Sequence, residues 1–111
     1  MPAMNAKGTG AAFSALLFLL NLSSAGAQPA QDPGRALLTK HCAQCHGISA
    51  GEKSRHQAAP GFAQIMKRYR AEMLAEALAE GLTTGHPDMP LFTFEPDEVA
   101  AIVGYLDTLS R

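Results

Sequence analysis

Apolar positions near the end of the chain recur at the spacing of one helix face, and they predict a helix from Pro96 to Leu109. The positions on this stripe are Val99, Ile102, Val103, Leu106 and Leu109. Pro96 suits the first turn of a helix, and Asp97 and Glu98 suit the positive end of the helix dipole. Glu95 is not a favoured N-cap residue, so the pattern leaves the start of this helix loosely defined.

Three earlier segments also have helical character. Asp32 is a favourable N-cap for a helix over Pro33–His41, whose first residue is a proline. A short helix is expected over Phe62–Arg68, and a longer amphipathic one over Arg70–Glu80, with Gly81 as its C-cap. The apolar face of the longer helix holds Met73, Leu74, Ala77 and Leu78, and its acidic face holds Glu72, Glu76 and Glu80. No segment of useful length alternates with period two, so the predicted fold class is all-α.

The first 27 residues have the pattern of an export signal. Lys7 gives a positive start, an apolar stretch runs from about Ala11 to Leu22, and Ala25-Gly26-Ala27 is a small-residue cleavage pattern. We expect a signal peptide over residues 1–27, cleaved after Ala27, and a periplasmic mature domain over residues 28–111. The alternative is an uncleaved membrane anchor, but the apolar stretch is shorter than the ~20 residues that a membrane span needs.

Length and charge narrow the function classes. The mature chain would keep 84 residues, with eight Lys and Arg against ten Asp and Glu, a formal charge of −2. So mild a charge gives no reason to expect nucleic-acid binding. A chain this short has difficulty building a sufficient core from side chains alone, so we expect a bound group to complete it.

The candidate chemistry lies in Cys42-Ala43-Gln44-Cys45-His46, a C-x-x-C-H motif typical of c-type haem attachment. The two thiols can bond to the haem vinyl groups, and the adjacent histidine can ligate the iron. Three alternatives stay open: a redox dithiol, a zinc site and a plain disulfide of an exported protein. No strand pattern precedes the motif, as a thioredoxin-like dithiol requires. The chain has no third cysteine, and His56 and His86 are thirty residues apart, which disfavours zinc.

A haem held by one histidine has a second axial position, for which thioether sulfur and imidazole are the realistic protein donors. The candidates in the mature chain are Met66, Met73, Met89, His41, His56 and His86. Met66 and Met73 lie in helical segments and are expected to pack in the core. His41 adjoins the attachment motif, so it cannot easily reach the opposite face of the haem. His56 lies in a polar loop, where we expect it to be solvated. Met89 is favoured because it precedes Pro90 in a stiff, non-helical segment.

Taken together, these features resemble a small class I cytochrome c over essentially the whole mature chain. The resemblance rests on a helix leading into Cys42-x-x-Cys45-His46, the loop proline Pro60, a middle helix, Met89-Pro90, and a last helix that carries Tyr105. It implies three to four helices wrapped around one covalently bound haem c. It also implies that Cys42 and Cys45 form the thioethers, that His46 and Met89 ligate the iron, and that the Pro60 carbonyl accepts the outer proton of His46.

The family also has a close crossing between its first and last helices. The resemblance places Gly34 against Tyr105 at this crossing, with Gly104 as an alternative contact. The family often has a tryptophan near the haem propionates, which this chain lacks, so Tyr69 and Arg70 are only weak candidates for that role.

The implied function is a carrier of single electrons between redox partner proteins, and not an enzyme. A haem with both axial positions filled leaves no site for substrate. Two alternatives remain: a subunit of a periplasmic dehydrogenase or oxidase complex, and a haem enzyme or sensor with a labile methionine ligand. The chain is basic from Lys53 to Arg70 and acidic from Glu72 to Asp107, which would give a dipole that orients partners, or simply two solvated faces.

Overall fold

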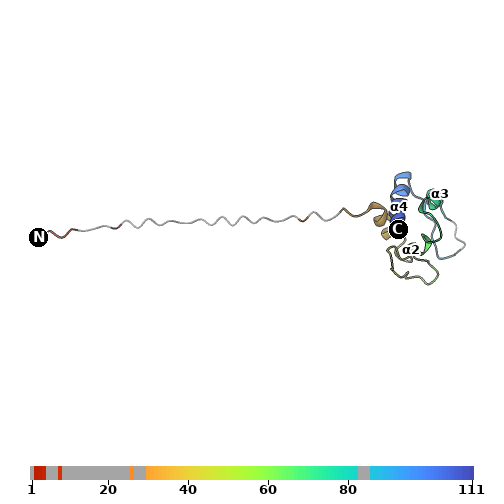
Figure 1. Cartoon of the computed structure of the whole chain (residues 1–111), viewed down its shortest axis with the longest axis horizontal. Helices are drawn as coiled ribbons and strands as arrows, with labels where there is room; N and C mark the ends of the chain where they lie inside the picture. The colour runs from red at the N-terminus through yellow and green to blue at the C-terminus, as the bar shows by residue number, and fades with distance from the viewer. Residues whose placement is uncertain (1, 5–7, 9–25, 27–29, 83–85) are drawn as a thin grey trace.

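The protein is described by a computed structural model that covers residues 2–4, 8, 26, 30–82 and 86–111. Its helices are α1 (Pro33–His41), α2 (Phe62–Ile65), α3 (Ala75–Glu80) and α4 (Pro96–Thr108), with a 3₁₀ turn η1 (Ala71–Leu74) leading into α3 (Figure 1). No strand occurs within these ranges, which confirms the all-α prediction. The predicted signal peptide falls almost entirely outside the described residues and stays a prediction.

Helix α1 begins and ends as its sequence predicts. The Asp32 carboxylate accepts the N–H groups of Gly34 and Arg35 at 2.9 and 3.1 Å, which satisfies two donors that the first helical turn leaves without partners. At the other end, the Cys42 N–H donates to the Leu38 carbonyl at 2.8 Å. The helix therefore delivers Cys42 directly from its last turn.

The core is centred on the crossing of α1 and α4. Leu38, Ile102 and Leu106 are fully buried there. A Cβ placed on Gly34 would lie 2.0 Å from the Ala101 carbonyl oxygen and 2.8 Å from the Tyr105 Cβ, so only glycine permits this approach. The expected contact between Gly34 and Tyr105 is confirmed. The alternative contact through Gly104 is wrong, because a Cβ there would meet nothing within 4 Å.

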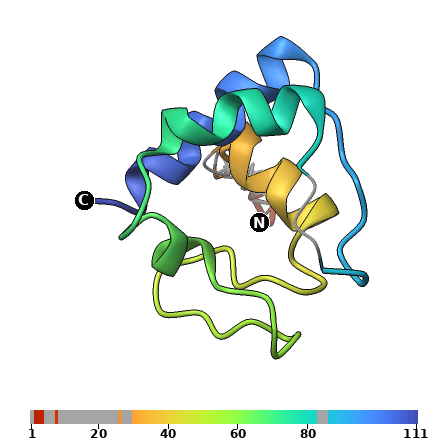
Figure 2. The same ribbon diagram turned by 90° about the vertical axis from the view of Figure 1, so that its right-hand side faces the viewer.

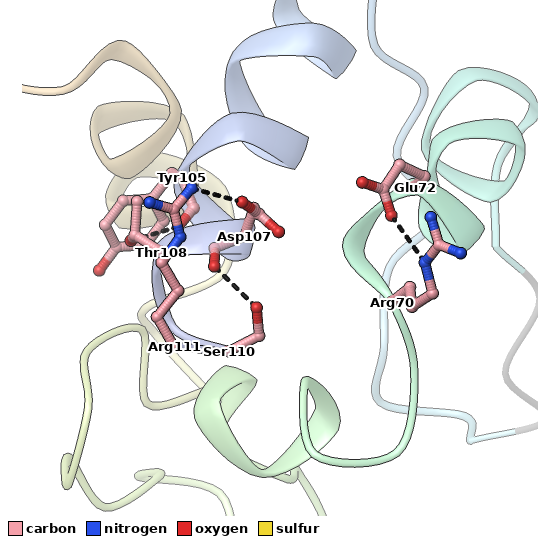
Figure 3. Close-up of polar contacts among 7 residues, drawn as sticks. All are labelled: Arg70, Glu72, Tyr105, Asp107, Thr108, Ser110 and Arg111. Atoms are coloured by element: carbon pink, nitrogen blue, oxygen red, sulfur yellow. Dashed lines mark hydrogen bonds and ion pairs between the residues drawn. The ribbon is translucent and has the colours of Figure 1, made fainter.

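Helix α4 has a better-defined start than its sequence suggests. The Glu98 carboxylate accepts the Glu95 N–H at 3.0 Å, which fixes the first turn although Glu95 is a poor N-cap residue. Beyond the helix, the Ser110 hydroxyl donates to the Asp107 carbonyl and the Arg111 guanidinium pairs with the Asp107 carboxylate at 2.8 Å (Figure 3). The end of α4 is thus held by contacts within its own last residues.

Two of the predicted helices are altered. Helix α2 ends at Ile65 rather than Arg68, because the N–H groups of Lys67 and Arg68 donate to carbonyls three residues back and the chain tightens into turns. The third segment starts as a 3₁₀ turn, in which positions three apart share a face. Ala71 is therefore buried and Leu74 packs against the core, whereas Met73 is 64% exposed. The expectation that Met73 packs in the core is wrong.

Seen end on, α1, α3 and α4 form one group, and the segment from 43 to 61 with α2 lies on one side of it (Figure 2). The link from residue 86 to 95 runs along the edge of this group back to α4. The segments that carry the two predicted iron ligands, His46 and Met89, thus both lie beside the group formed by α1, α3 and α4. Among the described residues, no helix is both long and apolar enough to cross a membrane.

Candidate functional site

The C-x-x-C-H motif forms a tight turn directly after α1. The N–H groups of Cys45 and His46 both donate to the Cys42 carbonyl, at 3.1 and 2.9 Å. This turn holds two partly buried, free thiols and one imidazole within five residues. The His46 ring also packs at a tilt against Phe62, with 5.3 Å between the ring centroids.

His46 is oriented by a backbone carbonyl. Its Nδ1 lies 2.7 Å from the Pro60 oxygen, so the Nδ1–H donates to that carbonyl and the lone pair of the neutral ring is on Nε2. This is the hydrogen bond that the sequence resemblance implies. An imidazole held in this way has one nitrogen ready to ligate a metal, and the carbonyl raises the basicity of that nitrogen.

Gly47 lets the following loop close against the motif and bring Pro60 into place. A Cβ on Gly47 would lie 2.4 Å from the Glu52 carbonyl oxygen, so a side chain here would push the loop away. The Gly47 carbonyl accepts the Phe62 N–H at 2.8 Å, and the Gly47 N–H donates to Ser54 Oγ at 3.0 Å. The position of the Pro60 carbonyl therefore depends on contacts made by the residue next to His46.

Glu52 stabilises the same loop from its surface. Its carboxylate accepts the N–H groups of Ser49 and Ile48 at 2.9 and 3.0 Å. These hydrogen bonds, first from Ser49 and then from Ile48, lower the pKa of Glu52 below its ordinary value. The loop is thus better closed when Glu52 is ionised.

The cysteine chemistry disfavours the dithiol alternative. Burial, and then the nearby Cys45, raise the pKa of the Cys42 thiol to about 11. A catalytic redox cysteine needs a lowered pKa so that its thiolate is present at neutral pH. Free thiols beside an oriented imidazole are instead the donor set that a covalently attached haem requires.

The candidates for the second axial ligand are spread over several segments. Met66 is only 5% exposed in the core, as expected, whereas Met73 is exposed. The His41 ring lies edge-on to Phe92 and Phe94, with centroid distances of 5.5 and 5.4 Å, so it belongs to an aromatic group beside α4.

Met89 is partly buried and ends a turn in which its N–H donates to the His86 carbonyl at 3.2 Å. The structure links this turn to the attachment motif through His56. The backbone N–H of His56 donates to the Cys45 carbonyl at 3.1 Å. The Nε2 of its ring lies 3.3 Å from the carboxylate of Asp88, the residue before Met89. Ligation of iron by Met89 stays a prediction.

Sequence reasoning missed this role of His56. Its side chain is 34% exposed and its ring lies edge-on to that of His86, with the centroids 5.3 Å apart, so the expected solvated His56 also has protein contacts. The separation of thirty residues, used against a shared metal site, did not keep the two histidines apart. No local pattern signals the contact, because it depends on how two loops fold toward each other.

The two weak propionate candidates lie between α2 and α3. Tyr69 is half exposed, and the exposed Arg70 side chain pairs with Glu72 at 3.5 Å, as Figure 3 shows. A role for either residue in binding haem stays a prediction.

Comparison with known proteins identifies the family. The cytochrome c family model matches residues 31–110. A "cytochrome c-553-like" protein from Synechocystis sp. is 33% identical over 78 residues, covering 70% of this chain and 68% of that protein. The search of solved structures gave no significant match. The motif fits the family, since Cys42 and Cys45 have the spacing of covalent haem c attachment. The chain belongs to the cytochrome c family, whose members are typically electron carriers rather than enzymes.

Proposed function

We propose that this cytochrome c carries single electrons between periplasmic redox proteins, with a haem held by Cys42 and Cys45 and ligated by His46 and Met89. The observation that carries the proposal is the 2.7 Å hydrogen bond from His46 Nδ1 to the Pro60 carbonyl, which leaves Nε2 as the donor to iron. When bound, the haem supplies a one-electron ferric/ferrous couple, whose potential a thioether ligand raises.

The protein would hold the residues that bind the haem in fixed positions. The tight turn after α1 holds both cysteines and His46 together, and the Gly47 contact holds the Pro60 carbonyl against the ring. Met89 is followed by Pro90, which restricts the backbone on which the sulfur is carried. If His46 and Met89 both ligate the iron, no position on it would be left for a substrate, which favours a carrier over an enzyme or sensor.

The proposed location is the periplasm. It rests on the export pattern of residues 1–27, with cleavage after Ala27. Redox partners follow from the family. We propose that docking is weak and transient, because a carrier must release each partner. The basic segment from 53 to 70 and the acidic segment from 72 to 107 would orient these encounters, so electron-transfer rates should fall as salt is added.

Met89 is tested by paired methionine variants of the exported, haem-loaded protein. Wild type should give a low-spin spectrum with the far-red band of a sulfur–ferric bond, and the haem should stay bound after denaturation. Met89→Ala should lose the band and become high-spin. Met73→Ala is the matched control, since Met73 is exposed, and it should keep the band. If Met89→Ala keeps the band, another residue is the ligand. A high-spin wild type would favour the enzyme or sensor alternative.

The dehydrogenase-subunit alternative is tested by isolation. The mature protein purified from its native host should elute alone, at the mass of one chain with one haem. Stoichiometric co-purification with a large oxidoreductase would contradict a freely diffusing carrier and support a dedicated subunit.

A further inference from the structure

His56, His86 and Asp88 form a cluster on the side of the molecule where two loops meet. Each residue offers one potential ligand atom, and these atoms all lie within 4.8 Å of one another. His56 Nε2 is 3.3 Å from Asp88 Oδ2, and the two imidazole rings meet edge to face at 5.3 Å. We propose that these three residues bind one divalent transition-metal ion of the Zn²⁺ class, separately from the haem.

The donor set determines the class of ion. Two imidazoles and one carboxylate suit Zn²⁺ and its borderline neighbours, whereas Ca²⁺ and Mg²⁺ prefer oxygen-only sites. Three protein ligands leave a fourth, open position for water, as in many zinc sites. An ion pair alone would need only His56 and Asp88. The second imidazole lies within 4.8 Å of both of these ligand atoms and adds a third ligand, which an ion pair would not need.

Without a bound ion, backbone N–H groups hold both rings in position. His56 Nδ1 accepts the Ala58 N–H at 3.1 Å, and His86 Nδ1 accepts the Asp88 N–H at 3.3 Å. Because Nδ1 of each ring has a backbone partner, Nε2 is the nitrogen that would ligate a metal. Binding would move the ring proton from Nε2 to Nδ1 and release the two backbone N–H groups to water. Ala58 and Asp88 are both exposed, so that exchange costs little.

The site is accessible to an ion from solution. The side chains of His56 and Asp88 are 34% and 66% exposed. A bound ion would connect the loop that closes on Cys45 to the turn that ends at Met89, since His56 also donates its N–H to the Cys45 carbonyl. A bound ion would therefore also stabilise the folded state.

The test is a calorimetric titration of the haem-loaded, ferric protein with Zn²⁺ alone. Zn²⁺ is redox-inert, so it does not react with the haem. We expect one ion per chain at micromolar affinity. His56→Gln and His86→Gln should each weaken binding at least tenfold, since even the outer partners of metal ligands are worth 10–100-fold. Gln57→Ala, a change in the same loop without a ligand, should leave binding unchanged. Binding only at millimolar Zn²⁺, or unchanged binding in both histidine variants, would overturn the proposal.

Two further measurements separate loss of the site from loss of the fold. The visible haem spectrum should be the same in His86→Gln as in wild type, which shows that the variant is folded. Zn²⁺ should raise the Tm of wild type and of Gln57→Ala, but not of His86→Gln. Anomalous diffraction at the zinc edge should place the ion between the two rings, and an ion bound at any other position would refute the assignment. None of these outcomes depends on which residue is the second ligand of the haem iron.

Discussion

Replacement of Gly34 by alanine tests the contact between α1 and α4 on which the core depends. The new Cβ would lie 2.0 Å from the Ala101 carbonyl oxygen, 2.6 Å from its carbon and 2.8 Å from the Tyr105 Cβ. Two of these three atoms are backbone, so no side-chain rotation can relieve the overlap. The helices have to separate, and they do so beside the fully buried Leu38.

The cost can be estimated from two opposing effects. Overpacking a core costs about 1–3 kcal/mol, and the upper part of the range applies because the clash is with backbone. Alanine also favours the helix over glycine by about 0.5–1 kcal/mol, which offsets part of the loss. The net loss is about 2 kcal/mol, which lowers the Tm of a domain of this size by about 8–16 °C.

The assay is thermal unfolding of the haem-loaded protein, followed by far-UV circular dichroism. Gly104→Ala is the matched control, because it makes the same chemical change in α4 where a Cβ would meet nothing within 4 Å. It should raise the Tm by a few degrees, about 0.5–1 kcal/mol, through helix propensity alone. The reasoning is refuted if Gly34→Ala leaves the Tm within about 2 °C of wild type, or if Gly104→Ala lowers it by as much.

Two further predictions concern the loop that carries Pro60. Tyr105→Phe removes the buried hydroxyl that donates to the Ile48 carbonyl at 2.7 Å and should cost about 1–2 kcal/mol in denaturant unfolding, with no change in the visible spectrum. A cost near zero would show that water replaces the bond. Glu52 has a lowered pKa in the folded protein, so its carboxylate stabilises the fold above the ordinary pKa of a glutamate, and this contribution is lost as the pH falls through the lowered pKa. Wild type should therefore be more stable than Glu52→Gln at neutral pH and equal to it in acid, and a pH-independent difference would contradict the role of the charge.

The parts of the fold that the sequence predicts well are those decided by neighbouring residues. Asp32 and Pro33 define the start of α1 because both the cap and the proline act within one turn. Gly81, with φ +97°, ends α3 for a similarly local reason. The haem-attachment motif is local too, since its two cysteines and its histidine lie within five residues.

Predictions fail first where tertiary contacts determine which side chains are buried. Helical periodicity placed Met73 on the packed face, but the 3₁₀ turn at Ala71 rotates it into solvent. Helical periodicity gave no signal for this change, because it assumes α-helical geometry from Arg70 onward. Periodicity alone also leaves Tyr105 off the apolar stripe of α4, and it was the family resemblance that placed it against Gly34; its buried hydroxyl donates to a carbonyl fifty-seven residues away.

His56 illustrates why a loop residue can escape prediction and still connect two parts of a site. Its own sequence context is polar, which by itself indicates exposure. The structure gives it three contacts. Its backbone N–H donates to the Cys45 carbonyl, its Nδ1 accepts the Ala58 N–H, and its Nε2 lies beside the Asp88 carboxylate. Each contact is weak and partly exposed, so none would stand out as a stabilising interaction. Together they join the turn that holds the cysteines to the turn that ends at Met89. For a domain with a small core, such cross-connections fix the distance between two loops that helix packing alone leaves free.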